Sequence, residues 1–176
     1  FAVIEETVEA ELGVRISDAF SFFDHVPLAS ASLGQVHRAA LRDGRPVAVK
    51  VQRPDIRQVI DDDMAALADL AEFLDRRTEW GRRFGFVEML EEFRQSLLRE
   101  LDYRIEAQNL VMLGENLAGV DLIDVPQPVH DFTSAHVLTM DFVGGRKITS
   151  LGPLALMEID GAALADALFR AYLKQI

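Results

Sequence analysis

The sequence predicts an α+β fold, because segments with the periodicity of strands and segments with the periodicity of helices occur in separate blocks. Apolar residues alternate between Ala19 and Gln52 and then recur every three or four residues through 55–116. Strand-like alternation returns at 126–145, and a last helical pattern covers 160–176. Hydrophobic residues make up 49% of the 176 residues, which is enough to build one compact core.

The first predicted elements are a short helix and a β-hairpin. Val3 to Leu12 has helical periodicity and is followed by Gly13, a residue type that commonly ends helices. Farther along, Asp43-Gly44 separates the strand-like segments QVHRAAL and PVAVKVQ. An Asp-Gly turn between two such segments predicts an antiparallel hairpin.

Two long amphipathic helices are predicted next, from Asp55 to about Arg77 and from near Phe86 to about Asn116. Their apolar stripes are formed by Ile56, Val59, Ile60, Met64, Leu67, Leu70 and Leu74 in the first helix and by Leu90, Phe93, Leu97, Leu101 and Ile105 in the second.

Two further strands are predicted at 126–132 and 136–145, followed by a loop and a helix from Asp160 to Ile176. The chain starts at Phe1 without an initiator Met, and the apolar pattern of the last helix continues to the final residue. We therefore expect a fragment of a longer protein.

The charge balance excludes nucleic acid as a partner. The chain has 29 acidic and 18 basic residues, and its formal net charge of −11 repels a phosphate backbone. It has no cysteine, so neither a disulfide framework nor a thiolate zinc site can form. No apolar run reaches the roughly 20 residues of a membrane-spanning helix, and no signal peptide opens the chain, so we expect a soluble, cytoplasmic segment.

Strand alternation assigns a direction to Lys50. In PVAVKVQ, Val47, Val49 and Val51 share one face of the strand, and Ala48 and Lys50 share the other. The valines are expected to face the core, so the lysine points to the opposite side, where the small alanine leaves room for a flat ligand. A lysine that is simply solvated is the alternative.

The segment before this hairpin has the spacing of a phosphate-binding loop. Residues 29–36 read A-x-A-x-x-G-x-V where protein kinases have G-x-G-x-x-G-x-V, and V-A-V-K follows where they have V-A-I-K. Alanine lacks the freedom of glycine to adopt positive φ, so the loop is expected to be stiffer and to lie closer over the phosphates. Ser30 and Ser32 would add hydroxyl donors. Taken alone, the segment could also be a plain loop.

A lysine that holds phosphates needs a carboxylate partner, and the candidates lie in RELDYRIEAQN. Asp102 and Glu106 are spaced i, i+4 on one helix face, whereas Glu100 points roughly 200° away from Asp102. On a straight helix the three acids cannot meet at one point. A solvated acidic helix face is the alternative.

Four motifs together resemble the AarF/UbiB family of atypical protein-kinase-like proteins, whose hallmark is an alanine-rich loop. They are PLASASLGQVHRA, VAVKVQRPDI, ELDYRIEAQN and VLTMDFVGG, and they cover nearly the whole chain. The resemblance implies a kinase-like small lobe at 1–143, with an antiparallel sheet of about five strands and a long two-helix insertion at about 55–100. Residues 144–176 would be the hinge exit and the first helices of a truncated large lobe.

The same resemblance implies roles for individual residues. Lys50 would be the nucleotide-binding lysine, Glu106 its helix partner, and Glu100 and Asp102 the family's E-x-D motif, and we group these four as catalytic. The remaining residues implied to bind ATP are Ala29, Ser30, Ala31, Ser32, Gly34, Val36, Ala48, Met140, Asp141 and Val143. Among these, Met140 would be the gatekeeper, and the hinge backbone after it would bind adenine.

Three family motifs are missing from this chain. The K-x-G-Q motif that precedes the alanine-rich loop is absent, and the catalytic loop and the D-F-G metal motif would follow Ile176. We therefore expect no metal ligands here. HDF at 130–132 and DFVG at 141–144 lie on predicted strands, where neither can serve as the metal motif.

The resemblance implies that the parent protein uses MgATP as a phosphotransferase or ATPase in support of isoprenoid quinone (ubiquinone or related) biosynthesis. It would be peripheral to or anchored at a membrane, with the membrane surface or quinone-biosynthesis proteins as partners, and this segment alone would be inactive. The alternative is a non-catalytic nucleotide-sensing or scaffold module whose helical insertion binds a partner.

A second candidate surface lies between the two long helices. In RRTEWGRRFGF, four arginines surround Trp80 and Phe84 and concentrate positive charge in an acidic chain. The segment is either a docking surface, for which an anionic membrane is a reasonable partner, or a helix–helix turn with an anchoring aromatic residue.

Overall fold

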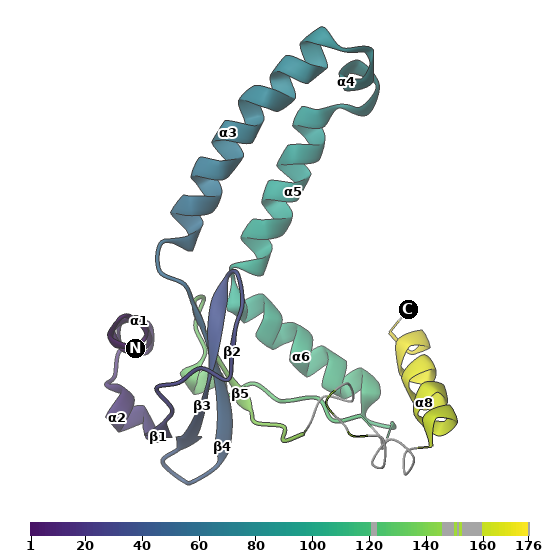
Figure 1. Ribbon diagram of the computed structural model, residues 1–176. Helices are drawn as coiled ribbons and strands as arrows, with labels where there is room; N and C mark the ends of the chain where they lie inside the picture. The colour runs from purple at the N-terminus through teal and green to yellow at the C-terminus, as the bar shows by residue number, and fades with distance from the viewer. Residues whose placement is uncertain (121–122, 146–149, 151, 153–159, 176) are drawn as a thin grey trace.

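The computed structural model describes all residues except 121–122, 146–149, 151, 153–159 and 176. A five-stranded antiparallel sheet lies between helices on both of its faces, and a long helical hairpin projects from one end (Figure 1). The predicted α+β fold is confirmed.

The element bounds are as follows. The helices are α1 (Ala2–Leu12), α2 (Ile16–Ala19), α3 (Ile56–Arg77), α4 (Glu79–Phe84), α5 (Phe86–Glu100), α6 (Tyr103–Leu117) and α8 (Gly161–Leu173), with one 3-10 turn, η1 (His130–Phe132). The strands are β1 (Phe20–Phe23), β2 (Ala29–Ser30), β3 (Gly34–Leu41), β4 (Pro46–Gln52) and β5 (Val137–Asp141).

The sheet has the order β1-β3-β4-β5, and the short β2 pairs with the start of β3. The predicted β3–β4 hairpin is present, with Gly44 at φ 88° in its turn. The pairing places Val36, Lys50 and Leu138 in one row across three strands, because β3 residue 36 and β5 residue 138 both flank β4 residue 50.

Both faces of β4 are covered. On one face, Val47, Val49 and Val51 are fully buried in a cluster with residues of α1 and α2, as the alternation predicts. On the other face, α6 packs Tyr103 and Ala107 against the sheet. Lys50 therefore points into the space between the sheet and α6, and its side chain is only 28% exposed.

The second long helix is interrupted, which corrects the prediction of one helix through 86–116. α5 ends at Glu100, and Asp102 caps α6 by accepting a hydrogen bond from the Arg104 backbone N–H at 3.1 Å. The Tyr103 N–H donates to the Ala135 carbonyl at 2.9 Å instead of continuing the helix. The buried Gln52 side chain donates to the Leu101 carbonyl at 2.8 Å.

The predicted strand at 126–132 does not form. This segment makes one isolated bridge, between Pro128 and Met140, and then turns into η1. Proline has no backbone N–H to donate, so Pro126 and Pro128 prevent a continuous ladder with β5. β5 also ends earlier than predicted, at Asp141.

The last predicted helix is present as α8, where the Asp160 side chain accepts hydrogen bonds from the Ala162 and Ala163 N–H groups. Ile176, its predicted end, lies outside the described residues. The boundary between residues 143 and 144 stays a prediction. Within the described ranges, no helix is both long and apolar enough to span a bilayer.

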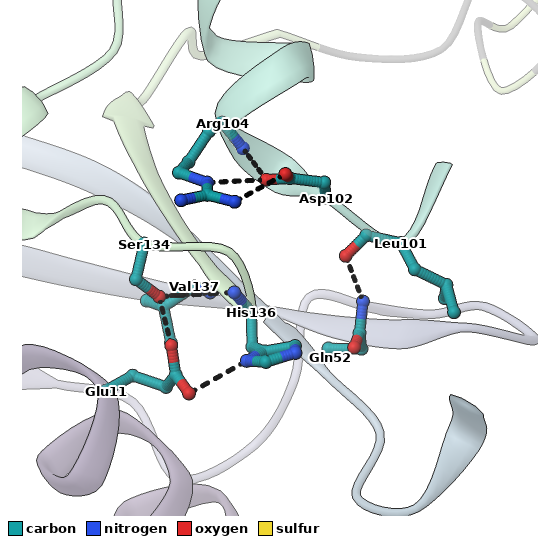
Figure 2. A network of polar contacts seen from close by, with 8 residues as sticks. All are labelled: Glu11, Gln52, Leu101, Asp102, Arg104, Ser134, His136 and Val137. Atoms are coloured by element: carbon teal, nitrogen blue, oxygen red, sulfur yellow. Dashed lines mark hydrogen bonds and ion pairs between the residues drawn. The ribbon is translucent and has the colours of Figure 1, made fainter. Parts of the chain in front are cut away.

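A polar network joins α1 to the turn before β5 (Figure 2). The Glu11 carboxylate accepts a hydrogen bond from the Ser134 hydroxyl at 2.6 Å and contacts His136 Nδ1 at 2.8 Å. The carbonyl of Ala135, between these two residues, accepts the hydrogen bond from the Tyr103 N–H at the start of α6. The same turn therefore contacts α1 on one face of the sheet and α6 on the other.

Removing the Glu11 carboxylate is expected to destabilise the protein more at neutral pH than at acid pH. Burial raises the pKa of Glu11, but hydrogen bonds from Ser134 and His136 outweigh burial and hold this pKa below its ordinary value. Such a carboxylate stabilises the fold above its unfolded pKa, and the contribution is lost as pH falls through the folded pKa. Glu11→Gln should lower the free energy of unfolding by about 1 kcal/mol at about pH 7 and by much less at about pH 3.

Urea unfolding at the two pH values measures the difference. Glu6→Gln, at an exposed position of the same helix, is the matched control and should change neither value. An equal loss at both pH values for the Glu11 variant would contradict the prediction.

Candidate functional site

A cavity of about 540 Å³ lies between the turn that joins β2 to β3, the end of α5 and the start of α6. This volume is within the range of small-molecule sites, roughly 300–1,000 Å³. The predicted site residues that line it are Ala31, Ser32, Gly34, Lys50, Glu100, Asp102 and Glu106.

The Lys50 ammonium and the Glu106 carboxylate form an ion pair in this cavity. Lys50 Nζ lies 2.6 Å from Glu106 Oε2, although the two residues are 56 positions apart. β4 holds the lysine rigidly in the sheet, and α6 presents the glutamate from its first turn. The pair is partly exposed, with side chains 28% and 38% accessible, so solvent screens part of its attraction.

Tyr103 forms the floor beneath the ammonium. Its ring centroid is 4.6 Å from Lys50 Nζ, a distance at which a cation is attracted to the ring face. The residue is 1% exposed, and burial, with a smaller effect of the Glu106 charge, raises the pKa of Tyr103 to about 12. The phenol therefore stays neutral, and its buried hydroxyl has no hydrogen-bond partner in the described part of the chain.

The alanine-rich segment is a tight turn. Ala29 and Ser30 pair with β3 as strand β2, and the Ala31 N–H donates to the Gly34 carbonyl at 2.8 Å. Gly34 is buried, and a Cβ placed there would lie 2.6 Å from the Val51 carbonyl oxygen and 2.7 Å from the Tyr103 hydroxyl. Glycine is needed here because the sheet and the tyrosine leave no room for a side chain.

The interruption between α5 and α6 brings the E-x-D residues to the same cavity as Glu106. Glu100 is the last residue of α5 and Asp102 the cap of α6, so the helix is not straight here, and all three acids line one cavity without converging on one point. Hydrogen bonds from the Arg104 side chain, at 2.9 and 2.7 Å, outweigh burial and lower the pKa of Asp102. Glu100 makes no ion pair among the described residues.

The other predicted binding residues lie outside the cavity lining. Ala48 and Met140 are paired across β4 and β5 on the sheet face that carries Lys50, in the row next to it. The Asp141 side chain accepts hydrogen bonds from Arg45 Nε at 2.8 Å and from the Gln127 N–H at 3.2 Å. Residues outside the cavity lining are Ala29, Ser30, Val36, Ala48, Met140, Asp141 and Val143.

Sequence reasoning missed four polar residues that line the cavity. Tyr103 precedes Glu106 by three positions on the same helix, and this i, i+3 spacing could have indicated it. Arg99, Ser96 and Asn109 also line the cavity, but the first two belong to α5, whose approach to the site depends on the break after it. Arg99 adds a second cation to the cavity lining.

The described residues do not form a metal site. No three Asp, Glu, His or Cys side chains in that part of the chain lie close enough together to hold a metal ion. Two of the three carboxylates at the cavity already have partners: Glu106 pairs with Lys50 and Asp102 with Arg104.

A lysine–glutamate pair between a sheet and a helix, beneath a tight turn that ends in glycine, defines a protein-kinase-like lobe. The chain matches the model of the ABC1 atypical kinase-like domain over residues 1–176 and belongs to this family. The resemblance to the AarF/UbiB family is thereby confirmed.

Curated relatives agree with this assignment. The chain is 36% identical over 172 residues to a probable protein kinase UbiB of Cellvibrio japonicus, covering 98% of this chain and 31% of that protein. It is 37% identical over 169 residues to the chloroplastic protein ACTIVITY OF BC1 COMPLEX KINASE 7 of Arabidopsis thaliana, covering 96% and 24%. The chain thus spans less than a third of the length of these relatives.

A solved structure has the same fold. A Mycobacterium tuberculosis protein, determined as a complex with erythromycin, is similar with a TM-score of 0.71 and 29% sequence identity. The similarity covers 84% of this chain and 37% of that one.

Proposed function

We propose that this chain is the ATP-binding lobe of an atypical kinase-like protein that acts as a phosphotransferase or ATPase. The observation that carries the proposal is the Lys50–Glu106 ion pair at the cavity beneath the alanine-rich turn. Phosphoryl transfer depends mostly on positioning and on electrostatic stabilisation, and both need a cation held at a fixed place.

Each part of the cavity has a role in this proposal. Lys50 neutralises phosphate charge, Glu106 and the Tyr103 ring hold its ammonium in place, and Ser32 offers a hydroxyl to a phosphate oxygen. Adenine would lie along the sheet face of Ala48 and Met140, toward the Asp141 carbonyl and the Val143 N–H. Mg²⁺, bound with ATP, would neutralise charge between the phosphates; its ligands are expected in other parts of the protein.

We infer that the whole protein supports isoprenoid quinone biosynthesis, of the ubiquinone type, at a membrane. The support is the family assignment and the similarity to a UbiB protein over nearly the full length of this chain. The catalytic base and the metal ligands are expected in the remaining parts of the protein. The isolated segment should therefore bind nucleotide weakly and show no turnover.

Titration of the full-length protein with MgATP, with and without lipid vesicles, tests the proposal. Lys50→Ala should weaken binding about tenfold or more by calorimetry, because it removes the cation that faces the phosphates. Arg42→Ala is the matched control, since it removes one positive charge from an exposed turn far from the cavity. Unchanged affinity in the Lys50 variant would refute the proposal.

A nucleotide-sensing or scaffold module is the second candidate, and one contact favours it. Leu33, at the tip of the alanine-rich turn, packs into the apolar cluster of Ile60, Met64 and Leu101 at the base of the helical hairpin. The Leu33 carbonyl also accepts a hydrogen bond from the Arg53 N–H at 2.9 Å. A nucleotide that moves the turn would move the hairpin. ATP binding without ATP turnover by the full-length protein would favour this candidate. So would a full-length sequence that lacks the H-x-D and D-F-G motifs.

A further inference from the structure

The hairpin tip, defined as residues 73–84, exposes aromatic side chains that the proposed nucleotide site does not use. Trp80 is 68% exposed and Phe84 51%, and their rings stack with centroids 5.7 Å apart and planes 9° apart. Phe73, near the end of α3, is 58% exposed. Figure 1 shows this tip at the end of the hairpin that lies farthest from the sheet. Exposed aromatic clusters of this kind mark interaction surfaces.

Hydrogen bonds and close packing fix the conformation of the tip. The Thr78 hydroxyl accepts the Gly81 N–H at 2.8 Å, and the Asp75 carboxylate accepts the Phe86 and Val87 N–H groups at 2.9 and 3.1 Å. Gly81 is buried, and a Cβ there would overlap the Leu74 carbonyl oxygen. The glycine therefore makes the close packing contact of this turn, while Trp80 and Phe84 remain largely exposed.

The tip also carries unpaired positive charge. Arg76 pairs with Glu72 at 2.8 Å, but Arg77, Arg82 and Arg83 form no ion pair within the described part of the chain. Two acidic residues lie in the tip. The Asp75 carboxylate accepts hydrogen bonds from the α5 backbone, and Glu79 is in the first turn of α4. In a chain of net charge −11, this end is where an anionic surface can approach.

We propose that the hairpin tip docks on an anionic phospholipid bilayer. Trp80 and Phe84 enter the interfacial region, which aromatic side chains with an apolar body prefer, and the guanidinium groups contact lipid phosphates. Each basic residue near an anionic bilayer contributes about 1 kcal/mol. The rest of the acidic chain is repelled from the same surface, so the protein binds with the tip toward the bilayer.

An acidic protein surface without an apolar patch explains the arginines but not the exposed aromatic pair. A bilayer accounts for both, because its interface offers phosphates and an apolar layer within a few ångströms. The 22 residues of α3 span about 33 Å, so the cavity at the hairpin base stays in water, where nucleotides are.

Vesicle sedimentation with the full-length protein tests this docking without using nucleotide. The probe is phosphatidylcholine vesicles containing about one third phosphatidylglycerol, compared with pure phosphatidylcholine. Arg82→Glu with Arg83→Glu should lower partitioning at least about tenfold, and Trp80→Ala with Phe84→Ala should do the same. Added salt should weaken binding of the wild-type protein.

Matched controls change the same residue types elsewhere on the surface. Phe22→Ala removes a phenylalanine that is 52% exposed on β1, and Arg57→Glu reverses an exposed charge near the hairpin base; both should bind like wild type. All four tip positions are exposed, so the unfolding midpoints should match that of wild type. Equal binding to neutral vesicles, or tip variants that bind like wild type, would overturn the proposal, as would a tip-dependent complex with an acidic protein and no vesicle binding.

Discussion

Replacing Glu106 with glutamine is expected to weaken ATP binding by the full-length protein about tenfold or more, because the Lys50 ammonium loses the carboxylate that holds it at 2.6 Å. Glutamine keeps the shape of the side chain, so the change removes charge without opening a cavity. The free energy of unfolding should change by less than about 1 kcal/mol, since both partners are partly exposed. Calorimetry and urea unfolding on the same preparations measure the two effects.

A double-mutant cycle tests whether Glu106 affects ATP binding through Lys50 or independently of it. The carboxylate acts through the ammonium, so Lys50→Met combined with Glu106→Gln should bind ATP no more weakly than Lys50→Met alone. Glu115→Gln is the control, because it neutralises an exposed acid farther along α6. Losses that simply add would show that Glu106 acts on the nucleotide independently of Lys50.

Gly34→Ala is expected to lower the free energy of unfolding by about 1–3 kcal/mol, the usual cost of overpacking. The new methyl group would lie 2.6 Å from the Val51 carbonyl oxygen and 2.7 Å from the Tyr103 hydroxyl. The carbonyl belongs to a central strand and cannot move cheaply, so the start of β3 must shift and displace the alanine-rich turn. Urea unfolding measures the loss, and ATP affinity should fall with it.

Two companion variants identify the cause. Gly161→Ala is the control, because its Cβ meets nothing within 4 Å. Tyr103→Phe alone should not destabilise the protein, since the hydroxyl it removes is buried without a partner. Added to Gly34→Ala, it should restore part of the lost stability by removing one of the two close contacts. No loss in Gly34→Ala would mean that the turn tolerates a side chain.

The direction of Lys50 could be predicted from the sequence because strand alternation is a local property. Val47, Val49 and Val51 fix which face of β4 enters the core, and Lys50 must then point to the other side. The sequence could not show that this other face is also covered. That depends on α6, which is brought against β5 by contacts such as Tyr103 and Ala107 against Leu138.

The interruption after Glu100 could not be predicted from periodicity. Leu97, Leu101 and Ile105 keep a spacing of four across it, so the apolar pattern reads as one helix. Residues distant in the sequence stabilise the interruption. The Ala135 carbonyl accepts a hydrogen bond from the Tyr103 N–H, and the Gln52 side chain donates one to the Leu101 carbonyl. The meeting of the three acids at one cavity depends on this change of direction.

The sequence by itself determined the β3–β4 hairpin, the amphipathic helix α3, the direction of Lys50 and the family, because side-chain period and motif spacing are properties of neighbouring residues. Only the tertiary structure decided where α5 ends, that Tyr103 lies under Lys50, and that Trp80 remains exposed while Gly81 packs. The physical reason is that these features depend on hydrogen bonds and steric contacts between separate elements. Local periodicity carries no record of such contacts.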